Sequence, residues 1–156
     1  MNDPVIRRAA PSDLKQVMEI ETQSFQEDAF HKHQMRYLLH SDNDFLVAET
    51  DSELAAYMVL LSRKNSRLLR IYALAVSTKF RGHGIARLML NKAKETAKNR
   101  GYTKLTLEVK ANNQAAISLY EQFGFQVRKN LPGYYKDGST GLKMEFSMPE
   151  SYNQFN

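Results

Sequence analysis

The chain has 156 residues, close to the length at which one domain buries about 70% of the surface of its unfolded chain. Hydrophobic residues make up 42% and charged residues 25%, which is typical of globular proteins and excludes a disordered chain. The formal net charge is +5, and the absence of cysteine excludes disulfides, thiolate zinc sites and cysteine nucleophiles. No stretch approaches the roughly 18 apolar residues of a spanning helix. We therefore expect a single domain over residues 1–149, a polar tail over 150–156, no membrane association and a cytoplasmic location.

The first half of the chain predicts a strand, two helices and three further strands. Leu14, Val17 and Met18 follow the i, i+3, i+4 spacing of an amphipathic helix, and Ser12 is a suitable N-cap for it. The other expected elements are a strand at Val5–Arg8, a short helix containing Met35, Leu38 and Leu39, a hairpin that turns at Asp51 and Ser52, and a strand over Leu68–Val76.

The second half alternates between strand and helix. The most regular helical spacing in the chain begins at Ile85, and Gly101 is placed as the glycine that ends this helix. The remaining expected elements are a strand over Lys104–Val109, a helix over Ala115–Phe123 closed by Gly124, a strand over Phe125–Lys129 and a final strand over Leu142–Met148.

A glycine-rich loop precedes the long helix, with the sequence Arg81-Gly82-His83-Gly84-Ile85-Ala86. A helix N-terminus offers unpaired N–H groups and partial positive charge, so such a loop either binds a pyrophosphate, with Arg81 adding charge, or simply turns the chain into a helix. Arg87 stands where a dinucleotide fingerprint needs its third glycine, and no Gly-Lys-Ser/Thr is present for a P-loop. The loop therefore disfavours NAD and ATP as ligands.

Two motifs together resemble a known family. Arg-x-x-Gly-x-Ala at Arg81–Ala86 looks like the pyrophosphate motif of GNAT-type N-acetyltransferases, which bind acetyl-coenzyme A. A second run has Leu107-Glu108-Val109, then Asn113, Ala116, Leu119-Tyr120 and Gly124-Phe125, and it is similar to the ribosomal-protein-alanine N-acetyltransferase branch. The resemblance spans about Val5 to Met148. It implies a mixed, mostly antiparallel α/β (α+β) sheet of about six to seven strands with about four helices, and acetyl transfer to an amine.

The resemblance also implies a role for individual residues. Glu108 is the implied general base, acting directly or through water, whereas by itself it would be a solvated strand carboxylate. Tyr120 is the implied proton donor to the coenzyme A sulfur, at a cost of about 2 kcal/mol for an ordinary tyrosine and a thiol near pKa 8.5; it is also suited to core packing. Asn113 is either a helix N-cap or a ligand of the pantetheine arm. The implied cofactor-binding residues are Leu74, Ala75, Val76, Arg81, Gly82, His83, Gly84, Ile85, Ala86, Asn113 and Tyr120.

The acceptor is expected to be a protein or peptide N-terminus. At pH 7 an α-amine of pKa about 8 costs about 1.4 kcal/mol to deprotonate, and a lysine about 4.6 kcal/mol, although burial also lowers an amine pKa. Phe25, Tyr134 and Tyr135 are the candidate acceptor-binding residues, with core packing as the alternative. The chain lacks the branch's proline-tryptophan pair within Ser24–His31, and it has Ser139-Thr140-Gly141 where the branch has an acidic residue.

Other charged residues are assigned to the surface. His31, His33 and His40 lack acidic or cysteine partners at ligand spacing, so no metal is expected. Lys64, Arg67 and Arg70 are expected to form a solvated face and not a nucleic-acid patch. A lysine or small-molecule acetyltransferase, a non-catalytic acyl-coenzyme A sensor and a basic nucleic-acid-binding domain are the alternatives, and the oligomeric state is expected to be monomer or homodimer.

Overall fold

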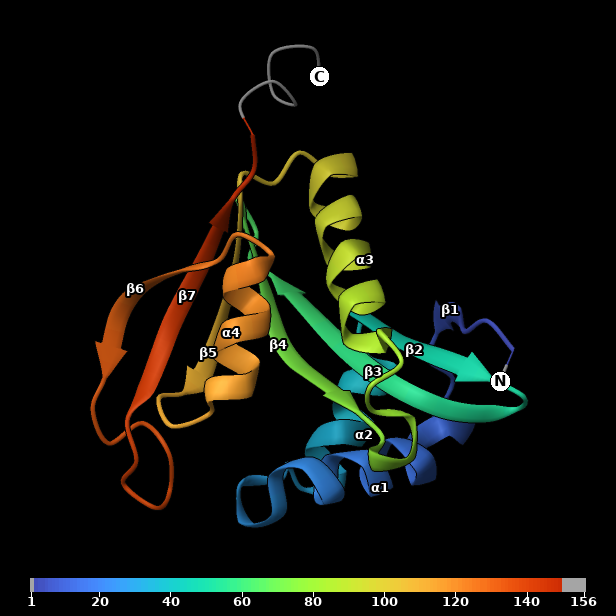
Figure 1. Ribbon diagram of the computed structural model, residues 1–156. Helices are drawn as coiled ribbons and strands as arrows, with labels where there is room; N and C mark the ends of the chain where they lie inside the picture. The colour runs from blue at the N-terminus through green and yellow to red at the C-terminus, as the bar shows by residue number, and fades with distance from the viewer. Residues whose placement is uncertain (1, 150–156) are drawn as a thin grey trace. The chain divides into compact units, whose positions relative to one another are not determined.

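The computed structural model describes residues 2–149, which form two compact units (Figure 1). Within these residues, the first unit covers 2–61 and 72–91, and the second covers 62–71 and 92–149. The chain passes from one unit to the other within β3 (Glu53–Ser62), β4 (Leu68–Val76) and α3 (Ile85–Asn99). The single domain expected over 1–149 stays a prediction, and the tail expected over 150–156 lies outside the described residues.

Seven strands form one sheet among the described residues, in the hydrogen-bonded order β1-β2-β3-β4-β5-β7-β6, and four α-helices accompany them. The fold class expected from the sequence is confirmed, and the boundaries of the expected strands agree to within two residues. Three short 3-10 turns, Pro11–Asp13, Gln26–Asp28 and Thr78–Phe80, were not expected. The remaining elements are β1 (Val5–Arg8), α1 (Leu14–Phe25), α2 (Lys32–His40), β2 (Asp44–Thr50), β5 (Lys104–Lys110), α4 (Gln114–Gln122), β6 (Gln126–Leu131) and β7 (Gly141–Ser147).

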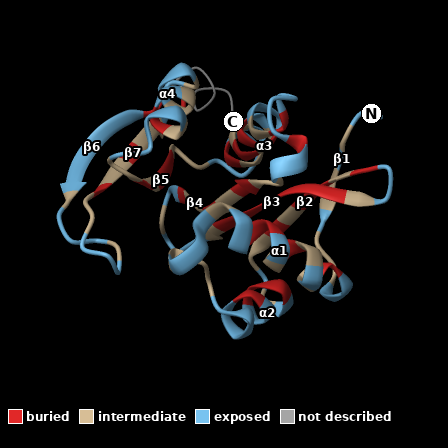
Figure 2. Ribbon diagram, turned by 60° about the horizontal axis from the view of Figure 1, so that its bottom comes forward, coloured by how far each residue is buried: buried red, intermediate tan, exposed pale blue. Residues whose placement is uncertain are grey.

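The first unit packs α1 and α2 on an antiparallel sheet of β1, β2 and β3 (Figure 1). Val17 and Ile20 on α1, and Met35 on α2, are buried in one cluster with Val47 of β2 and Tyr57 of β3. Figure 2 shows buried residues following β2 and β3. The apolar stripes that predicted the helices are thus the faces that the sheet covers.

The start of α1 differs from the sequence prediction. Ser12 is not the N-cap, because it lies inside the 3-10 turn and Asp13 occupies the N-cap position. The Asp13 carboxylate accepts hydrogen bonds from the Ala10 N–H at 2.7 Å and from both terminal nitrogens of Arg7, at 2.8 and 2.9 Å. These bonds hold the 3-10 turn that leads into α1. The Arg7 guanidinium also lowers the pKa of Asp13.

The second unit is organised around β5. The first four residues of β4 pair with β5 in parallel, from Leu68 with Lys104 to Ile71 with Leu107. β7 pairs with β5 on its other side in antiparallel register, and β6 is an exposed edge strand with a bulge between Val127 and Lys129. β5 is therefore paired along both edges, which fixes the face on which each of its side chains lies.

Helix ends in the second unit are closed by specific contacts. Gly101 has φ of 75°, and the Tyr102 N–H donates to the Ala97 carbonyl at 2.9 Å, so α3 ends in a Schellman motif. Gly124 has φ of 91°, and a Cβ there would lie 3.0 Å from the ring of Phe146, so both conformation and space require glycine. Lys94 donates to the Phe123 carbonyl at 2.5 Å and caps the end of α4, and burial lowers the pKa of this lysine.

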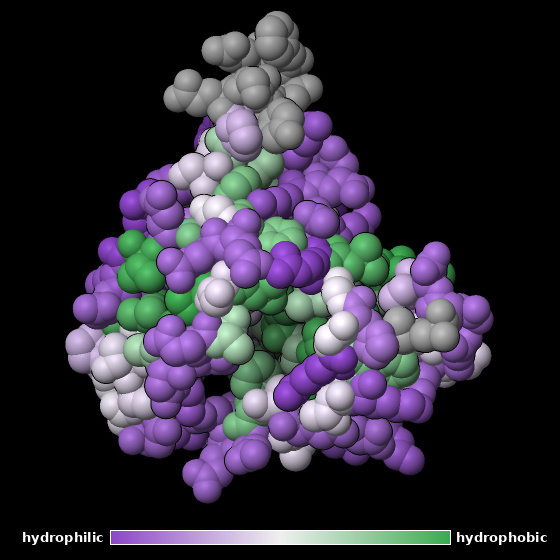
Figure 3. All heavy atoms as spheres, in the orientation of Figure 1, coloured by the Kyte–Doolittle hydropathy of each residue, from purple (hydrophilic) through white to green (hydrophobic). Residues whose placement is uncertain are grey.

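The surface carries the polar residues that the composition predicts. In Figure 3 hydrophilic residues cover most of the visible face, and apolar residues form separate patches among them. Among residues 2–149, none of the helices has the length and the apolar character that crossing a membrane requires.

Asp13→Asn is expected to destabilise the fold by about 1–3 kcal/mol, because Asp13 is 5% exposed and its charged hydrogen bonds are lost, while Arg7 stays partly solvated. Urea unfolding at pH 7 measures this change. The folded pKa of Asp13 is lowered, so its contribution is present above pH 4 and is lost as the pH falls through the folded value. The difference between wild type and variant should therefore shrink at acid pH.

The exposed ion pair of Lys79 with Glu53 provides the control. Lys79→Gln should cost less than about 1 kcal/mol. An Asp13→Asn cost as small as that of the control would contradict the assigned role of Asp13.

Candidate functional site

The glycine loop lies in the first unit, between the 3-10 turn Thr78–Phe80 and α3. Gly82 and Gly84 have φ of 82° and 77°, a conformation that side chains other than glycine rarely adopt. A Cβ on either residue would meet no atom within 4 Å. Backbone conformation, and not crowding, therefore requires these glycines, and the space above both α-carbons is open to a ligand.

The loop leads directly into the N-terminus of α3. The Leu88 N–H donates to the Gly84 carbonyl at 3.1 Å and begins the hydrogen bonds of α3. The N–H groups of Ile85 and Ala86 come before it and have no acceptor within the helix. The side chain of Ile85 is buried and anchors the turn, whereas His83 is exposed. Aligned N–H groups at a helix start attract phosphate oxygens.

Arg81 stays close to this loop. Its Nε donates to the Val76 carbonyl at 3.4 Å, and its Nη2 lies 3.5 Å from the Ser24 hydroxyl. Leu74 and Val76 are half-buried and Ala75 is buried at the end of β4. The strand end, Arg81 and the glycine loop are therefore neighbours within the first unit.

Glu108 lies in the second unit, on the solvent-facing side of β5, with 18% of its side chain exposed. The guanidinium of Arg70 holds both of its oxygens, with Nη2 3.0 Å from Oε1 and Nε 3.2 Å from Oε2. Such a two-point pair holds the carboxylate in one orientation. Each carboxylate oxygen has a second lone-pair site, so Glu108 can still accept a proton from another direction.

Arg70 is partly exposed, as expected, but it also pairs with Glu108, which the sequence did not predict. Its pairing depends on the register of β4 with β5, in which Arg70 is opposite Thr106 and two residues from Glu108 on the same face. An arginine inside the otherwise apolar strand Leu68–Val76 was the sequence signal for this contact. The parallel register itself is not visible in the sequence.

Tyr134 and Tyr135 lie together in the loop between β6 and β7, with ring centres 5.0 Å apart at 85°. The Tyr134 hydroxyl is 3.4 Å from Nη2 of Arg70, so this tyrosine joins the pair of Arg70 and Glu108. Phe25, the third candidate for acceptor binding, belongs to the first unit, where it ends α1 and is 39% exposed. The structure thus places Tyr134 against the arginine that holds the expected base, with Tyr135 packed on Tyr134.

Tyr120 is a half-buried residue of α4. Its ring packs against Phe125 at 5.9 Å, and burial raises its pKa to about 12. Proton donation to a thiolate of conjugate acid near 8.5 then costs about 5 kcal/mol instead of about 2, at about 1.36 kcal/mol per pKa unit. The hydroxyl stays protonated throughout the neutral range, and packing and proton donation are compatible roles for this side chain.

Asn113 caps α4, because its Oδ1 accepts from the Ala116 N–H at 3.1 Å. The sequence prediction that Asn113 is a helix N-cap is therefore confirmed. The cap uses the side-chain oxygen and leaves the amide nitrogen out of the bond, so contact with pantetheine stays a prediction.

A buried acid in the first unit was missed. Glu21 accepts hydrogen bonds from the Tyr57 hydroxyl and from the Phe30 N–H, the latter at 2.9 Å, and burial raises its pKa. Phe30 in turn stacks on Tyr72 with ring centres 5.1 Å apart. A glutamate on the apolar stripe of α1 was the sequence signal. These contacts hold the segment that follows Phe25.

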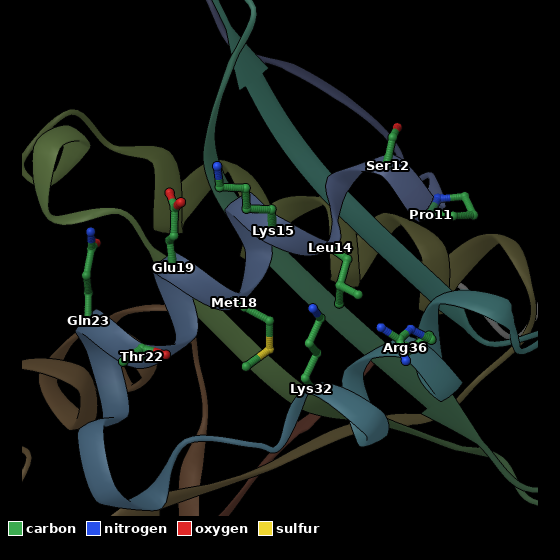
Figure 4. A pocket seen from close by; sticks show the side chains of 10 residues that line it. All are labelled: Pro11, Ser12, Leu14, Lys15, Met18, Glu19, Thr22, Gln23, Lys32 and Arg36. Carbon is green, nitrogen blue, oxygen red and sulfur yellow. The ribbon is translucent and has the colours of Figure 1, made fainter.

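A surface groove of about 760 Å³ follows α1 and α2 (Figure 4). None of the expected site residues lines it. Its lining residues are Pro11, Ser12, Leu14, Lys15, Met18, Glu19, Thr22, Gln23, Lys32 and Arg36. Within residues 2–149, no group of three histidine, cysteine, aspartate or glutamate side chains is arranged to hold a metal ion.

Comparison with known proteins identifies the class of protein that this fold and these motifs define. The model of the acetyltransferase (GNAT) family matches residues 14–125. N-alpha-acetyltransferase 30 of Schizosaccharomyces pombe is 30% identical over 120 residues, which cover 74% of this chain and 80% of that protein. The putative [ribosomal protein bS18]-alanine N-acetyltransferase of Bacillus subtilis is 31% identical over 93% of this chain and 96% of its own length.

A solved structure agrees at the level of the fold. The crystal structure of Ard1 from Thermoplasma volcanium has a TM-score of 0.88 and 24% sequence identity, over 96% of this chain and 100% of that one. The present chain belongs to the GNAT acetyltransferase family and is an N-acetyltransferase.

Asn113→Ala is expected to lower the free energy of unfolding by about 1 kcal/mol through loss of the cap. Asn113→Asp keeps an oxygen acceptor and should retain most of the stability. Asn112→Ala, at the exposed neighbour that does not cap α4, is the matched control. Denaturant unfolding of the three variants would contradict the cap if Asn113→Ala and Asn112→Ala cost the same.

Proposed function

We propose that this N-acetyltransferase transfers acetyl from acetyl-coenzyme A directly to the α-amine at a protein or peptide N-terminus. The observation that carries the proposal is the oriented carboxylate of Glu108, which is held by Arg70 beside Tyr134. Both named relatives in the comparison act, by their names, as N-α- or ribosomal-protein-alanine acetyltransferases. The lower cost of deprotonating an α-amine at pH 7, about 1.4 against 4.6 kcal/mol for lysine, favours the same acceptor.

The residues of the first unit fit the donor. Open space above Gly82 and Gly84, the first N–H groups of α3 and the charge of Arg81 suit a pyrophosphate. The backbone of Leu74, Ala75 and Val76 is proposed to bind the pantetheine arm, with a main-chain N–H polarising the thioester carbonyl. The bound cofactor supplies an activated acetyl thioester, and the protein has to place the amine and move two protons.

Glu108 is proposed to take one proton from the acceptor ammonium, directly or through a water. The neutral amine nitrogen then bonds to the acetyl carbon, the carbon–sulfur bond breaks, and the second proton of the nitrogen leaves through water to restore the tyrosine that has protonated the sulfur. Tyr120 is proposed to give its proton to the departing thiolate, at a cost of about 5 kcal/mol for a tyrosine whose pKa burial raises to about 12. Asn113, through its amide nitrogen, is proposed to contact the cofactor while its oxygen caps α4.

Other expectations remain part of the proposal. Phe25, Tyr134 and Tyr135 are proposed to bind the acceptor. A cytoplasmic location, the monomeric or homodimeric state and the lack of nucleic-acid binding stay predictions. Acetylation of lysine or of a small amine is the alternative acceptor class, and the assay below separates it.

Thiol release from acetyl-coenzyme A tests the acceptor class. We expect release with peptides that have a free N-terminus and no lysine, and none with N-terminally blocked peptides that carry an internal lysine, nor with polyamines. Glu108→Gln should lower kcat/KM by about 10²–10⁴-fold with the active peptides, because the base is lost. Release only with lysine peptides or polyamines would overturn the proposed acceptor.

Glu121→Gln is the matched control for Glu108→Gln, because Glu121 is an exposed residue of α4 in the same unit. It should keep the wild-type rate. A Glu108→Gln enzyme with wild-type rate and pH profile would show that Glu108 is not the base.

Arg81→Gln is expected to weaken acetyl-coenzyme A binding about tenfold, since one charge-assisted contact to phosphate is worth about 1.5 kcal/mol. Calorimetric titration gives the dissociation constant directly. Lys79→Gln removes the same charge two residues away, from a lysine paired with Glu53, and should change the affinity much less. Equal effects of the two substitutions would reject a specific phosphate contact of Arg81.

A further inference from the structure

The expected base is already engaged with a cation before any acceptor arrives. Arg70 binds both oxygens of Glu108, and 37% of the Arg70 side chain and 18% of the Glu108 side chain are exposed. An approaching ligand can therefore reach both members of the pair. The pair is a preformed positive and negative charge, fixed side by side by two strands.

The surroundings of this pair are rich in positive charge. Lys143 is the cross-strand partner of Glu108, and Lys110 lies two residues further along the same face of β5. Asp137 is 3.4 Å from the Lys110 ammonium, and Glu145 is 4.0 Å from that of Lys143. Glu145 is also shared with Lys104 and Arg128, at 3.7 and 3.6 Å, so five cations face the three carboxylates Glu108, Asp137 and Glu145.

A simple ammonium fits this site poorly. It can use the second lone-pair site of a Glu108 oxygen, but as a cation it must then come close to the guanidinium of Arg70, which holds the same oxygens at 3.0 and 3.2 Å. An acceptor that carries a carboxylate next to its amine avoids this conflict. Its carboxylate replaces Glu108 on the guanidinium fork, and its ammonium meets the carboxylate that has been released.

We infer that Arg70 is a specificity-determining residue that binds an acceptor carboxylate, so that the preferred substrates are N-termini with an acidic first or second residue. The inference rests on the proposed function, because it assigns the acceptor class of the same site. Arg70 anchors the acid, Glu108 is freed to take the ammonium proton, and the Tyr134 hydroxyl, 3.4 Å from Nη2, helps to hold the guanidinium as its partner changes. Positive charge on the neighbouring strands favours the same acidic peptides.

Matched peptides test the inference on the full-length enzyme. One pair begins with Asp or Asn, and a second begins with Ala-Asp or Ala-Asn, with identical sequences beyond. Wild type should prefer the acidic member of at least one pair by about tenfold or more in kcat/KM. Arg70→Gln should bring that ratio close to one, and Arg70→Lys should restore part of it.

The ratio separates specificity from structural support. If Arg70 only positioned Glu108, Arg70→Gln would lower kcat/KM for both members of a pair equally and leave the ratio unchanged. Lys64→Gln is the control, since it removes one positive charge from an exposed turn residue of the same unit. It should leave the ratio at the wild-type value, and a loss of preference in this variant would show a general charge effect and overturn the role of Arg70.

Failure of the inference and failure of the proposed function give different results. Equal kcat/KM for acidic and amide peptides in wild type would overturn the role of Arg70 and leave N-terminal acetylation in place. Free aspartate is tested as a third kind of acceptor. If it is acetylated in an Arg70-dependent manner while no peptide is, the carboxylate contact stands and the acceptor is a small amino acid, which overturns the proposed function.

Discussion

The parallel pairing of β4 with β5 is the constraint on which the candidate chemistry of this protein depends. Because Arg70 is opposite Thr106 in that register, its guanidinium reaches the carboxylate of Glu108 two residues further along the same face. β7 closes the other edge of β5, so Glu108 cannot turn to the buried face without a change of register. The orientation of one carboxylate therefore follows from backbone hydrogen bonds on both sides of its strand.

The glycine loop is a second case in which backbone geometry provides the chemistry. Gly82 and Gly84 adopt positive φ with open space around them, and the first N–H groups of α3 follow at once. Because glycine has no side chain, the loop suits an anionic group through its main-chain donors and through Arg81. Two of the proposed site residues have structural roles in the second unit. Asn113 caps α4, and Tyr120 packs against Phe125 with a pKa of about 12.

Membership of the GNAT family accounts for the sheet order and for the position of the two motifs, but relatives of about 30% identity leave the acceptor open. The residues that distinguish acceptors are those whose contacts depend on long-range pairing. Arg70, Glu108 and Tyr134 come from β4, from β5 and from the loop before β7, and they converge in one cluster of charges and hydroxyl. In the role inferred for Arg70, its pair with Glu108 favours acceptor amines that carry a carboxylate near the nitrogen.

The sequence by itself determined the family, the order of the elements and most of their boundaries, because periodicity, capping glycines and the two motifs are local properties of the chain. It also predicted the glycine loop, Glu108, Tyr120 and the cap at Asn113. It misplaced the N-cap of α1, since Asp13 is selected by its bonds to Arg7 and Ala10 and not by its spacing from the apolar stripe. Only the tertiary structure decided that Arg70 binds Glu108, that Glu21 is buried against Tyr57 and that the pKa of Tyr120 rises. Each of these depends on contacts between residues far apart in the chain, and strand register and burial create such contacts.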